Sequence, residues 1–336
     1  MKMLARLIDG VSARVLILLG VVTVALLVAP LIAGDYLLTV LILILYFAYI
    51  GQAWNIMMGF AGQLSLGHAL YVGLGAYTAA ALHMHFGIGP WIGLLVAVPV
   101  AALAGAFIGF LAFRFKVGGV YFAILTIAVC EFARVGFDHL AWTHGSSGLF
   151  LPVSQYSGND LWLLRGRPAM FYYVLLVATA LAFIGCRMLL QSRIGYFWRA
   201  IREDEEAARS TGIDTFHYKM IAVVISASMT SFAGVIYAFY YNNLFPEQVF
   251  HISRSIEIIL GPIVGGVGTL FGPILGAFVL TGLAETLNTV LAALGIDLPG
   301  AKQVFYGVCL LLVIMTLPDG VWPWLARRIG LSERKS

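Results

Sequence analysis

Long apolar stretches separated by short polar segments run through nearly all of the 336 residues. A helix rises about 1.5 Å per residue and the hydrocarbon layer is about 30 Å thick, so one crossing needs roughly 20 mainly apolar residues. The pattern predicts about ten transmembrane helices, or eight or nine if residues 62–69 or 255–272 are re-entrant. The predicted spans are residues 14–33, 37–58, 62–85, 90–113, 120–140, 170–190, 219–242, 255–270, 273–293 and 302–317. We therefore expect an all-α polytopic membrane protein.

Positive charges orient these spans. Lysine and arginine gather at the N-terminus, at 114–116, across 187–219 and in the tail at 327–335. With ten spans all four groups lie on one side, which the positive-inside rule assigns to the cytoplasm, whereas Arg165 and Arg167 fall on the other side. The N and C termini are therefore predicted to be cytoplasmic.

The same pattern indicates one transmembrane domain over residues 1–325 and a cytoplasmic tail over 326–336. A loop rich in Gly, Ser, Pro and Trp at 142–169 is expected on the outer side, and the loop at 191–218 in the cytoplasm. The lipid bilayer is thus the first expected partner of the chain.

Composition narrows the function classes further. Hydrophobic residues make up 61% of the chain, well above the roughly 45–50% of soluble domains, and the net charge of +4 is too small to suggest a nucleic-acid partner. Cys130, Cys186 and Cys309 are scattered among apolar residues and have no metal-ligand spacing. His83 and His85 are two residues apart, so a helix points them in different directions and no metal site is predicted.

One polar stretch lies close to the start of the third predicted span. Gln63, Ser65 and His68 stand among five glycines between residues 59 and 75. Polar side chains at membrane depth are costly without partners, so they face the bundle interior. Two interpretations stay open: these residues form a wall of a substrate path, or they form a polar seam between helices.

Three acidic residues, Glu131, Glu257 and Glu285, lie in or near predicted spans. An ionised carboxylate there costs roughly 2.5 to 3.5 kcal/mol on insertion scales. Arg134 follows Glu131 by three residues and so shares its helix face. Glu257 and Glu285 have no obvious partner in the sequence, but from neighbouring helices they could contact each other or Arg254. Structural pairing is the favoured interpretation. A proton relay is the alternative, and it would make the protein an ion-coupled secondary transporter or channel.

Six glycines between residues 261 and 276 include G-x-x-x-G spacings at 261/265, 268/272 and 272/276. Small residues at this spacing let two helix backbones approach closely. The run therefore predicts a close-packed seam, within a broken helix around residues 255–272.

The stretch "AIREDEEAARSTG" at 200–212 holds a quarter of the acidic residues of the chain. Ala, Glu and Arg favour helix, so we expect a helix over 197–211 that ends at Gly212 as the C′ residue. An anionic inner leaflet would repel its carboxylates. A protein partner therefore suits this helix better than lipid, and a solvated linker helix is the alternative.

Motifs for catalysis are missing from the sequence. A phosphate-binding loop needs G-x-x-x-x-G-K-[ST], and none of the five lysines follows a glycine, so the chain is not expected to hydrolyse ATP. No HExxH or GxSxG motif accompanies His68, and an intramembrane enzyme using His68 with a carboxylate therefore ranks last among the hypotheses. We expect no catalytic residues and no bound cofactor.

The acidic stretch contains a motif that is typical of a protein family. Glu206, Ala207, Ala208 and Gly212 form E-A-A-x-x-x-G, which resembles the EAA motif of ABC importer permeases, although residues 220–223 depart from its usual I-x-L-P continuation. The wider pattern resembles the LivM branch of the branched-chain amino acid permease family. It comprises "GFAGQLSLGHALYVGLGAYTAA" (59–80), "GVYFAILTIAVCEFAR" (119–134), "RAIREDEEAARSTGID" (199–214), "SIEIILGPIVGGVGTLFGPILGA" (255–277) and "LPDGVW" (317–322).

The resemblance implies a permease subunit of an ATP-driven importer in the inner membrane of a bacterium. Its implied partners are a second, LivH-like permease, two cytoplasmic ATPase subunits that use the ATP, and a periplasmic substrate-binding protein. The implied ATPase-coupling residues are Glu205, Glu206, Ala207, Ala208 and Gly212. The implied substrates are branched-chain or related amino acids, with urea or short amides as alternatives. No charged ring or aromatic cage is visible in the sequence to choose among them.

Overall fold

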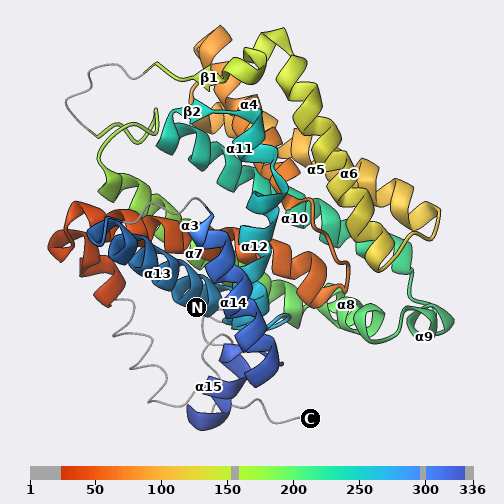
Figure 1. Cartoon of the computed structure of the whole chain (residues 1–336). Coiled ribbons are helices and arrows are strands. Elements are labelled where there is room, and N and C mark those ends of the chain that lie inside the picture. The colour runs from red at the N-terminus through yellow and green to blue at the C-terminus, as the bar shows by residue number, and fades with distance from the viewer. Residues whose placement is uncertain (1–23, 153–158, 296–299, 330–336) are drawn as a thin grey trace, which may run out of the picture.

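The computed structural model describes residues 24–152, 159–295 and 300–329. Helices dominate these residues and run between two ends of the molecule (Figure 1). The short strands β1 (Leu149–Phe150) and β2 (Asn243–Leu244) lie at one end, and helices α8 (Arg193–Glu203), α9 (Glu205–Ser210) and α15 (Val321–Ile329) lie at the other. The predicted outer and cytoplasmic loops are therefore separated by the length of the bundle.

Six helices among the described residues are long and apolar enough to cross a membrane. They are α3 with its extension η1 (Asp35–Phe60), α5 (Pro90–Arg114), α6 (Val120–His139), α7 (Pro168–Gln191), α10 (Thr215–Tyr241) and α13 (Gly272–Ala293). Each coincides with a predicted span, so an all-α, multi-pass membrane protein is confirmed.

The other predicted spans are less complete. Helix α4 (His68–Phe86) has 19 residues, α12 (Ile252–Gly265) has 14 and α14 (Ala301–Thr316) has 16, and none of them is among the six candidate spans. Of the first predicted span, residues 24–32 are helical and the rest lie largely outside the described residues. The total of ten spans and the cytoplasmic position of both termini thus stay predictions.

The helical parts of two predicted spans are shorter than hydropathy alone predicts, and the second is broken within residues 255–272, as expected. The π-helix η1 (Ile56–Phe60) extends α3, residues 61–67 are not helical, and α4 begins only at His68. Similarly, α12 ends at Gly265 and residues 266–271 form a turn. The predicted bounds at residues 62 and 270 are therefore wrong.

The side chain of Asn55 explains how the turn at 266–271 is tolerated. Its Oδ1 accepts a hydrogen bond from the backbone N–H of Gly268 at 2.8 Å, and its Nδ2 donates to the carbonyl of Thr269 at 2.9 Å. Backbone groups freed from a helix inside a membrane protein need such partners. Asn55 thus joins the end of α3 to the turn at 266–271.

Helices α3 and α10 lie at the centre of the bundle and are the most buried of the six candidate spans. Helix α10 packs on α4 and α5, while α3 packs on α7, α12 and α13. Helices α12 and α13 approach each other so closely that a Cβ atom on Gly265 would overlap the backbone of Gly272, and one on Gly276 would overlap the carbonyl of Gly261. The close-packed glycine seam predicted between residues 261 and 276 is confirmed.

The predicted outer loop is tied to the end of α10. Strands β1 and β2 pair antiparallel, with Leu149 opposite Leu244, and the 3-10 turns η2 (Ala141–Thr143) and η3 (Gly145–Ser147) precede β1. The short helix α11 (Pro246–Phe250) follows β2 and returns the chain toward α12. The side chain of Phe250 stacks on Tyr77 of α4, with ring centroids 5.8 Å apart.

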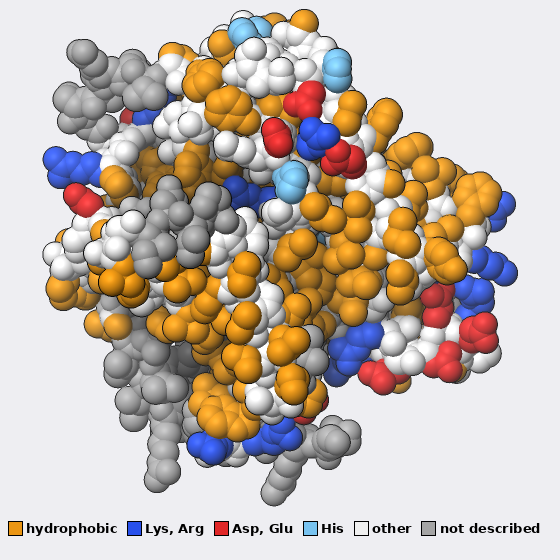
Figure 2. All heavy atoms as spheres, viewed as in Figure 1, with side chains coloured by type: hydrophobic (Ala, Val, Ile, Leu, Met, Phe, Trp, Pro, Cys, Tyr) orange, Lys and Arg blue, Asp and Glu red, His pale blue; other side chains and the backbone are white. Residues whose placement is uncertain are grey.

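Large apolar side chains cover much of the surface shown in Figure 2, and charged side chains gather toward the ends of the bundle. Leu103, Phe107 and Phe132, on α5 and α6, are each more than 60% exposed. The surface of a soluble protein rarely exposes large contiguous apolar patches. The exposed apolar surface therefore fits contact with lipid.

Candidate functional site

The predicted helix at 197–211 is two helices, α8 and α9, separated at Asp204. Asp204 has extended backbone (φ −156°, ψ 109°), and its Oδ1 accepts hydrogen bonds from the backbone N–H groups of Glu206 at 2.9 Å and Ala207 at 3.0 Å. Aspartate is a favoured N-cap because its carboxylate satisfies N–H groups that the first turn leaves free. The expectation of one continuous helix is wrong, and one acid of the cluster is the cap that starts α9.

Gly212 ends α9 as predicted. Its φ is +89°, in the left-handed region that favours glycine. Its N–H donates to the carbonyl of Arg209 at 3.0 Å, and the N–H of Ile213 donates to the carbonyl of Ala208 at 3.2 Å. These bonds close a short, capped helix at the margin of the bundle, at the end opposite β1 and β2 (Figure 1).

An ion pair fixes α9 to α10. Glu205 Oε1 accepts a hydrogen bond from Lys219 Nζ at 2.7 Å and one from Arg209 at 3.1 Å. Lys219 is only 8% exposed, and its Nζ lies 4.6 Å from the centre of the Phe113 ring. Glu205 therefore holds the inner side of α9 against the start of α10.

The five residues implied as ATPase-coupling residues divide between the two sides of α9. Glu206, Ala207 and Gly212 are exposed, whereas Ala208 is buried and Glu205 is half-buried. The exposed three are available to a partner protein. The other two residues fix α9 on the chain's own helices. The motif spacing alone does not show which of the five residues dock a partner and which only hold the helix in place.

The Glu205 ion pair predicts a pH dependence. Partial burial works to raise the pKa of the Glu205 carboxyl, but Lys219, with smaller contributions from Thr215 and Arg209, outweighs burial and holds that pKa below its usual value. The pair therefore contributes stability above the unfolded-state pKa of about 4.3, and that contribution is lost as the pH falls through the lower folded-state pKa.

At pH 7 we expect Glu205→Gln to lower the hydrogen-exchange protection of residues 205–213 about two- to fivefold, because a half-exposed ion pair contributes up to about 1 kcal/mol. The difference from the wild type should shrink as the pH falls below about 4.3, the unfolded-state pKa. Glu206→Gln, the matched change on the exposed side, should leave protection unchanged. Equal effects of the two substitutions would contradict this role for the ion pair.

Arg202, in the last turn of α8, connects the same loop to the interrupted helices. Its Nη1 donates to the carbonyl of Gly59 at 2.6 Å, and a Cβ atom on Gly268 would lie 2.5 Å from that nitrogen. Arg202 therefore contacts both the end of η1 and the turn at 266–271. Asp204, two residues later in the sequence, is the N-cap of α9.

The predicted polar residues Gln63, Ser65 and His68 are all buried. The two ring nitrogens of His68 lie 3.1 Å from Ser65 Oγ and 2.9 Å from Ser226 Oγ of α10, and Gln63 donates to the backbone of residue 61 at 3.0 Å. His68 thus meets hydroxyls rather than a carboxylate. This geometry is that of a polar seam between α4 and α10, and a role in the substrate path stays a prediction.

Two hydroxyls that sequence reasoning missed complete this seam. Thr126 Oγ1 of α6 accepts from the N–H of Leu66 at 3.1 Å, and Ser255 Oγ of α12 accepts from the N–H of Ala69 at 3.0 Å. Ser255 satisfies an N–H group in the first turn of α4 that has no helical partner, and Thr126 satisfies an N–H group of the non-helical residues before α4. The available signal was the presence of Ser and Thr at these positions within otherwise apolar spans.

Each of the three carboxylates in or near spans has a polar partner. The pairs are Glu131 with Arg134 at 2.6 Å, Glu257 with Arg254 at 3.1 Å and Glu285 with Asn288 at 3.5 Å. The first pair forms as the i,i+3 spacing predicts. Within the described residues, no cluster of three or more His, Cys, Asp and Glu side chains has the arrangement of a metal site.

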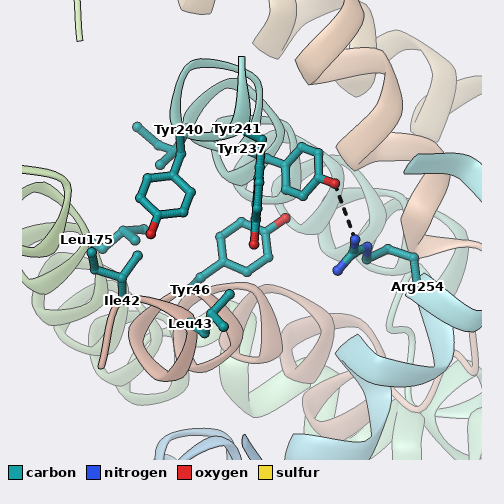
Figure 3. A pocket seen from close by; sticks show the side chains of 9 residues that line it. Ile42, Leu43, Tyr46, Leu175, Tyr237, Tyr240, Tyr241 and Arg254 are labelled. Carbon is teal, nitrogen blue, oxygen red and sulfur yellow. Dashed lines mark hydrogen bonds between the residues drawn. The ribbon is translucent and has the colours of Figure 1, made fainter. Parts of the chain in front are cut away.

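A pocket rich in tyrosine lies where α3, α7, α10 and α12 meet (Figure 3). Its lining residues are Ile42, Leu43, Tyr46, Leu175, Ile236, Tyr237, Tyr240, Tyr241 and Arg254. Three of the tyrosines stand at i, i+3 and i+4 on α10 and so share one helix face. Sequence reasoning missed this group of tyrosines, and the segment "YAFYY" at 237–241 was the available signal for it.

Arg254 places a positive charge at this pocket. It donates to the hydroxyl of Tyr237 at 3.4 Å and to Glu257 at 3.1 Å, and its guanidinium lies 5.2 Å from the centre of the Tyr237 ring. The hydroxyl of Tyr46, which is 5% exposed, has no hydrogen-bond partner among the described residues. Figure 3 shows that this hydroxyl is directed toward the side of the pocket where Arg254 lies.

Comparison with known proteins relates the chain to transport proteins. The model of a family described as "Branched-chain amino acid transport system / permease component" matches residues 36–314. The LivM permease protein of the high-affinity branched-chain amino acid transport system of Escherichia coli K12 is 27% identical, over 99% of this chain and 80% of its own length.

Two other relatives have similar sequence identities to this chain. The LivH permease protein of the same bacterium is 26% identical over 82% of this chain and 90% of its own length. A probable LivM protein of Methanocaldococcus jannaschii is 24% identical over 80% of this chain and 88% of its own length. No solved structure matches the chain.

Proposed function

Because the chain belongs to the family of permease components of branched-chain amino acid transport systems, we propose that it is a transmembrane subunit of an ATP-driven importer in the bacterial inner membrane. Its proposed substrates are branched-chain or related amino acids, as the names of its relatives suggest. Urea or short amides remain the alternative within this class of transporter.

The proposed assembly contains a second permease similar to LivH, two cytoplasmic ATPases and a periplasmic substrate-binding protein. Similarity of this chain to both LivM and LivH supports a pair of related permeases. The sequence has no phosphate-binding loop, so the ATP would be hydrolysed by the partners. The chain's own part is to contact the ATPases, move with them and open the path on alternate sides.

The observation that carries the proposal is the construction of α9. Its exposed side presents Glu206 and Ala207, while Asp204 caps its start and the ion pair of Glu205 with Lys219 fixes it to α10. A partner that moves α9 would therefore move α10 with it instead of bending a free loop. Helix α10 continues to the polar seam at Ser226 and to the tyrosines of the pocket.

Purification of the tagged chain from its native membrane tests the proposed assembly. We expect two ATPase subunits and a second permease to co-purify with the wild type. Glu206→Lys should lower the recovered ATPase about tenfold or more, since a loss of about 1.4 kcal/mol in binding is a tenfold change. The chain itself should still purify as a folded protein, because Glu206 is exposed.

Glu247→Lys provides the matched control. It makes the same charge change at an exposed position of α11, at the other end of the molecule, and should leave ATPase recovery unchanged. Equal recovery with Glu206→Lys would contradict the docking role of α9. Uptake that needs no ATPase and collapses with an ionophore would instead identify an ion-coupled transporter.

A further inference from the structure

One side of α15 carries basic and aromatic side chains together. Trp324, Arg327 and Arg328 are exposed, whereas Ala326 is buried. The guanidinium of Arg328 lies 4.4 Å from the centre of the Trp324 ring, within the range of attraction between a cation and an aromatic face. Figure 2 shows Lys or Arg side chains beside hydrophobic ones where α15 lies. We call Trp324, Arg327 and Arg328 the basic face of α15.

The positive charge of this face is only weakly balanced by the chain itself. Arg327 pairs with Asp319 at 3.2 Å, but both side chains are more than 60% exposed, and water screens such a pair. Within the described part of the chain, Arg328 has no acidic partner. The basic face can therefore offer guanidinium groups to an anionic partner.

The position of α15 brings this face to the membrane surface. Leu312 and Met315, near the end of α14, are 53% and 74% exposed, so an apolar surface that fits lipid continues to the last turn of α14. Only residues 317–320 separate α14 from α15. Gly320 has a φ of +90°, in the left-handed region that favours glycine at a sharp turn. The basic face thus begins where the apolar surface ends.

The other side of α15 is fixed to the bundle. Trp322 stacks on Phe271, with ring centroids 4.5 Å apart, and a Cβ atom on Gly266 would lie 2.9 Å from the ring of Pro323. Both contacts are with the turn at 266–271. Because this packing determines the orientation of α15, its basic face stays directed away from the chain's own helices.

An anionic phospholipid fits this surface in charge and in position. Basic residues next to a membrane span are attracted to the anionic headgroups of the cytoplasmic leaflet. A guanidinium matches the geometry of phosphate, and Trp is enriched at the level of the headgroups. Helix α15 also lies apart from α9, the proposed ATPase contact, at the end of the molecule that is predicted to be cytoplasmic (Figure 1).

We propose that the basic face of α15 binds the headgroup of an anionic phospholipid in the cytoplasmic leaflet. Arg327 and Arg328 contact the phosphate, and the ring of Trp324 holds the Arg328 guanidinium at the level of the headgroup. Phosphate replaces Asp319 as the partner of Arg327. This site goes beyond the proposed function, which does not depend on it.

Native mass spectrometry of the whole purified transporter, titrated with phosphatidylglycerol, counts the bound lipids and tests the site. Phosphatidylcholine with the same acyl chains has no net charge and should bind more weakly to the wild type. Arg328→Gln should weaken the binding of phosphatidylglycerol about fivefold, the effect of about 1 kcal/mol per basic residue at the membrane surface. Trp324→Leu should weaken it in the same direction, because Arg328 loses the ring that positions it.

Arg199→Gln is the matched control. It removes the same charge from an exposed arginine of α8, at the same end of the molecule, and should leave the binding of phosphatidylglycerol unchanged. An equal loss in Arg199→Gln would mean attraction by overall charge and would overturn the site. Unchanged binding in Arg328→Gln, or a wild type that binds both lipids equally, would overturn it as well.

An acidic surface of a partner protein is the competing occupant of the basic face. Recovery of the ATPases with Arg328→Gln should equal recovery with the wild type. If ATPase recovery falls while phosphatidylglycerol binding stays the same, the face contacts protein and the proposal is overturned. A complex that assembles with its ATPases but shows no preference for phosphatidylglycerol retains the proposed function and loses only the lipid site.

Discussion

Arg202→Ala is expected to lower the initial rate of transport about tenfold or more while the ATPase subunits stay bound. The guanidinium of Arg202 joins α8 to the carbonyl of Gly59 at 2.6 Å and lies against the turn that contains Gly268. A hydrogen bond that involves a charged group is worth about 1.5 to 3 kcal/mol. If this bond is made in only one of the transporter's conformations, its loss changes the balance between them by that amount.

The measurement is uptake into proteoliposomes together with ATP hydrolysis by the same preparation. ATP hydrolysis that continues while uptake falls is the expected signature, because α9 and its exposed side remain intact. Arg199→Ala, an exposed arginine one turn earlier on α8, should leave uptake near the wild-type rate. Wild-type uptake by Arg202→Ala, or an equal loss in Arg199→Ala, would rule out this connection.

The second large effect is expected at Gly276, where helix backbones touch. A Cβ atom at this position of α13 would overlap the carbonyl of Gly261 on α12, and backbone cannot move aside as a flexible side chain can. Overpacking typically costs 1 to 3 kcal/mol, and the small-residue contact is the basis of close helix packing in membranes. We expect Gly276→Ala to destabilise the protein by about 3 kcal/mol and to lower its yield of folded protein.

Gly282→Ala is the matched control on the same helix, because no atom lies within 4 Å of its added Cβ. Alanine is a better helix former than glycine by about 1 kcal/mol, so this variant should be at least as stable as the wild type. Thermal unfolding in detergent, followed by size-exclusion chromatography, measures both. Similar melting temperatures for the two variants would mean that α12 and α13 are not locked at Gly276.

The features predictable from the sequence are those set by neighbouring residues. The six long apolar helices follow from hydropathy, the glycine at 212 from helix-end chemistry, and the pairing of Glu131 with Arg134 from helical spacing. Each depends on residues that lie within a few turns of one another. A single sequence carries this information directly.

Two of the features that were missed depend on partners far apart in the chain, and a third is a local cap. A broken helix was expected around residues 255–272, but not that Asn55, more than 200 positions away, holds its turn at 266–271. Hydropathy averaged over a window does not register such a contact. The split at Asp204 arises because capping outweighs helix propensity at one residue. The tyrosine pocket needs Tyr46 of α3 beside three tyrosines of α10, a juxtaposition created only by the fold.

The rotational phase of α10 aligns three parts of the molecule at once. Lys219 meets Glu205, Ser226 meets His68, and Tyr237 meets Arg254, all on one uninterrupted helix. Successive residues of a helix are turned by about 100°, since 3.6 residues make one turn. One inserted residue would therefore turn everything beyond it by that angle and misalign the pocket with α9. The number of residues in α10 is thus as constrained as their identity. Related sequences should differ in this helix by substitutions instead of insertions or deletions.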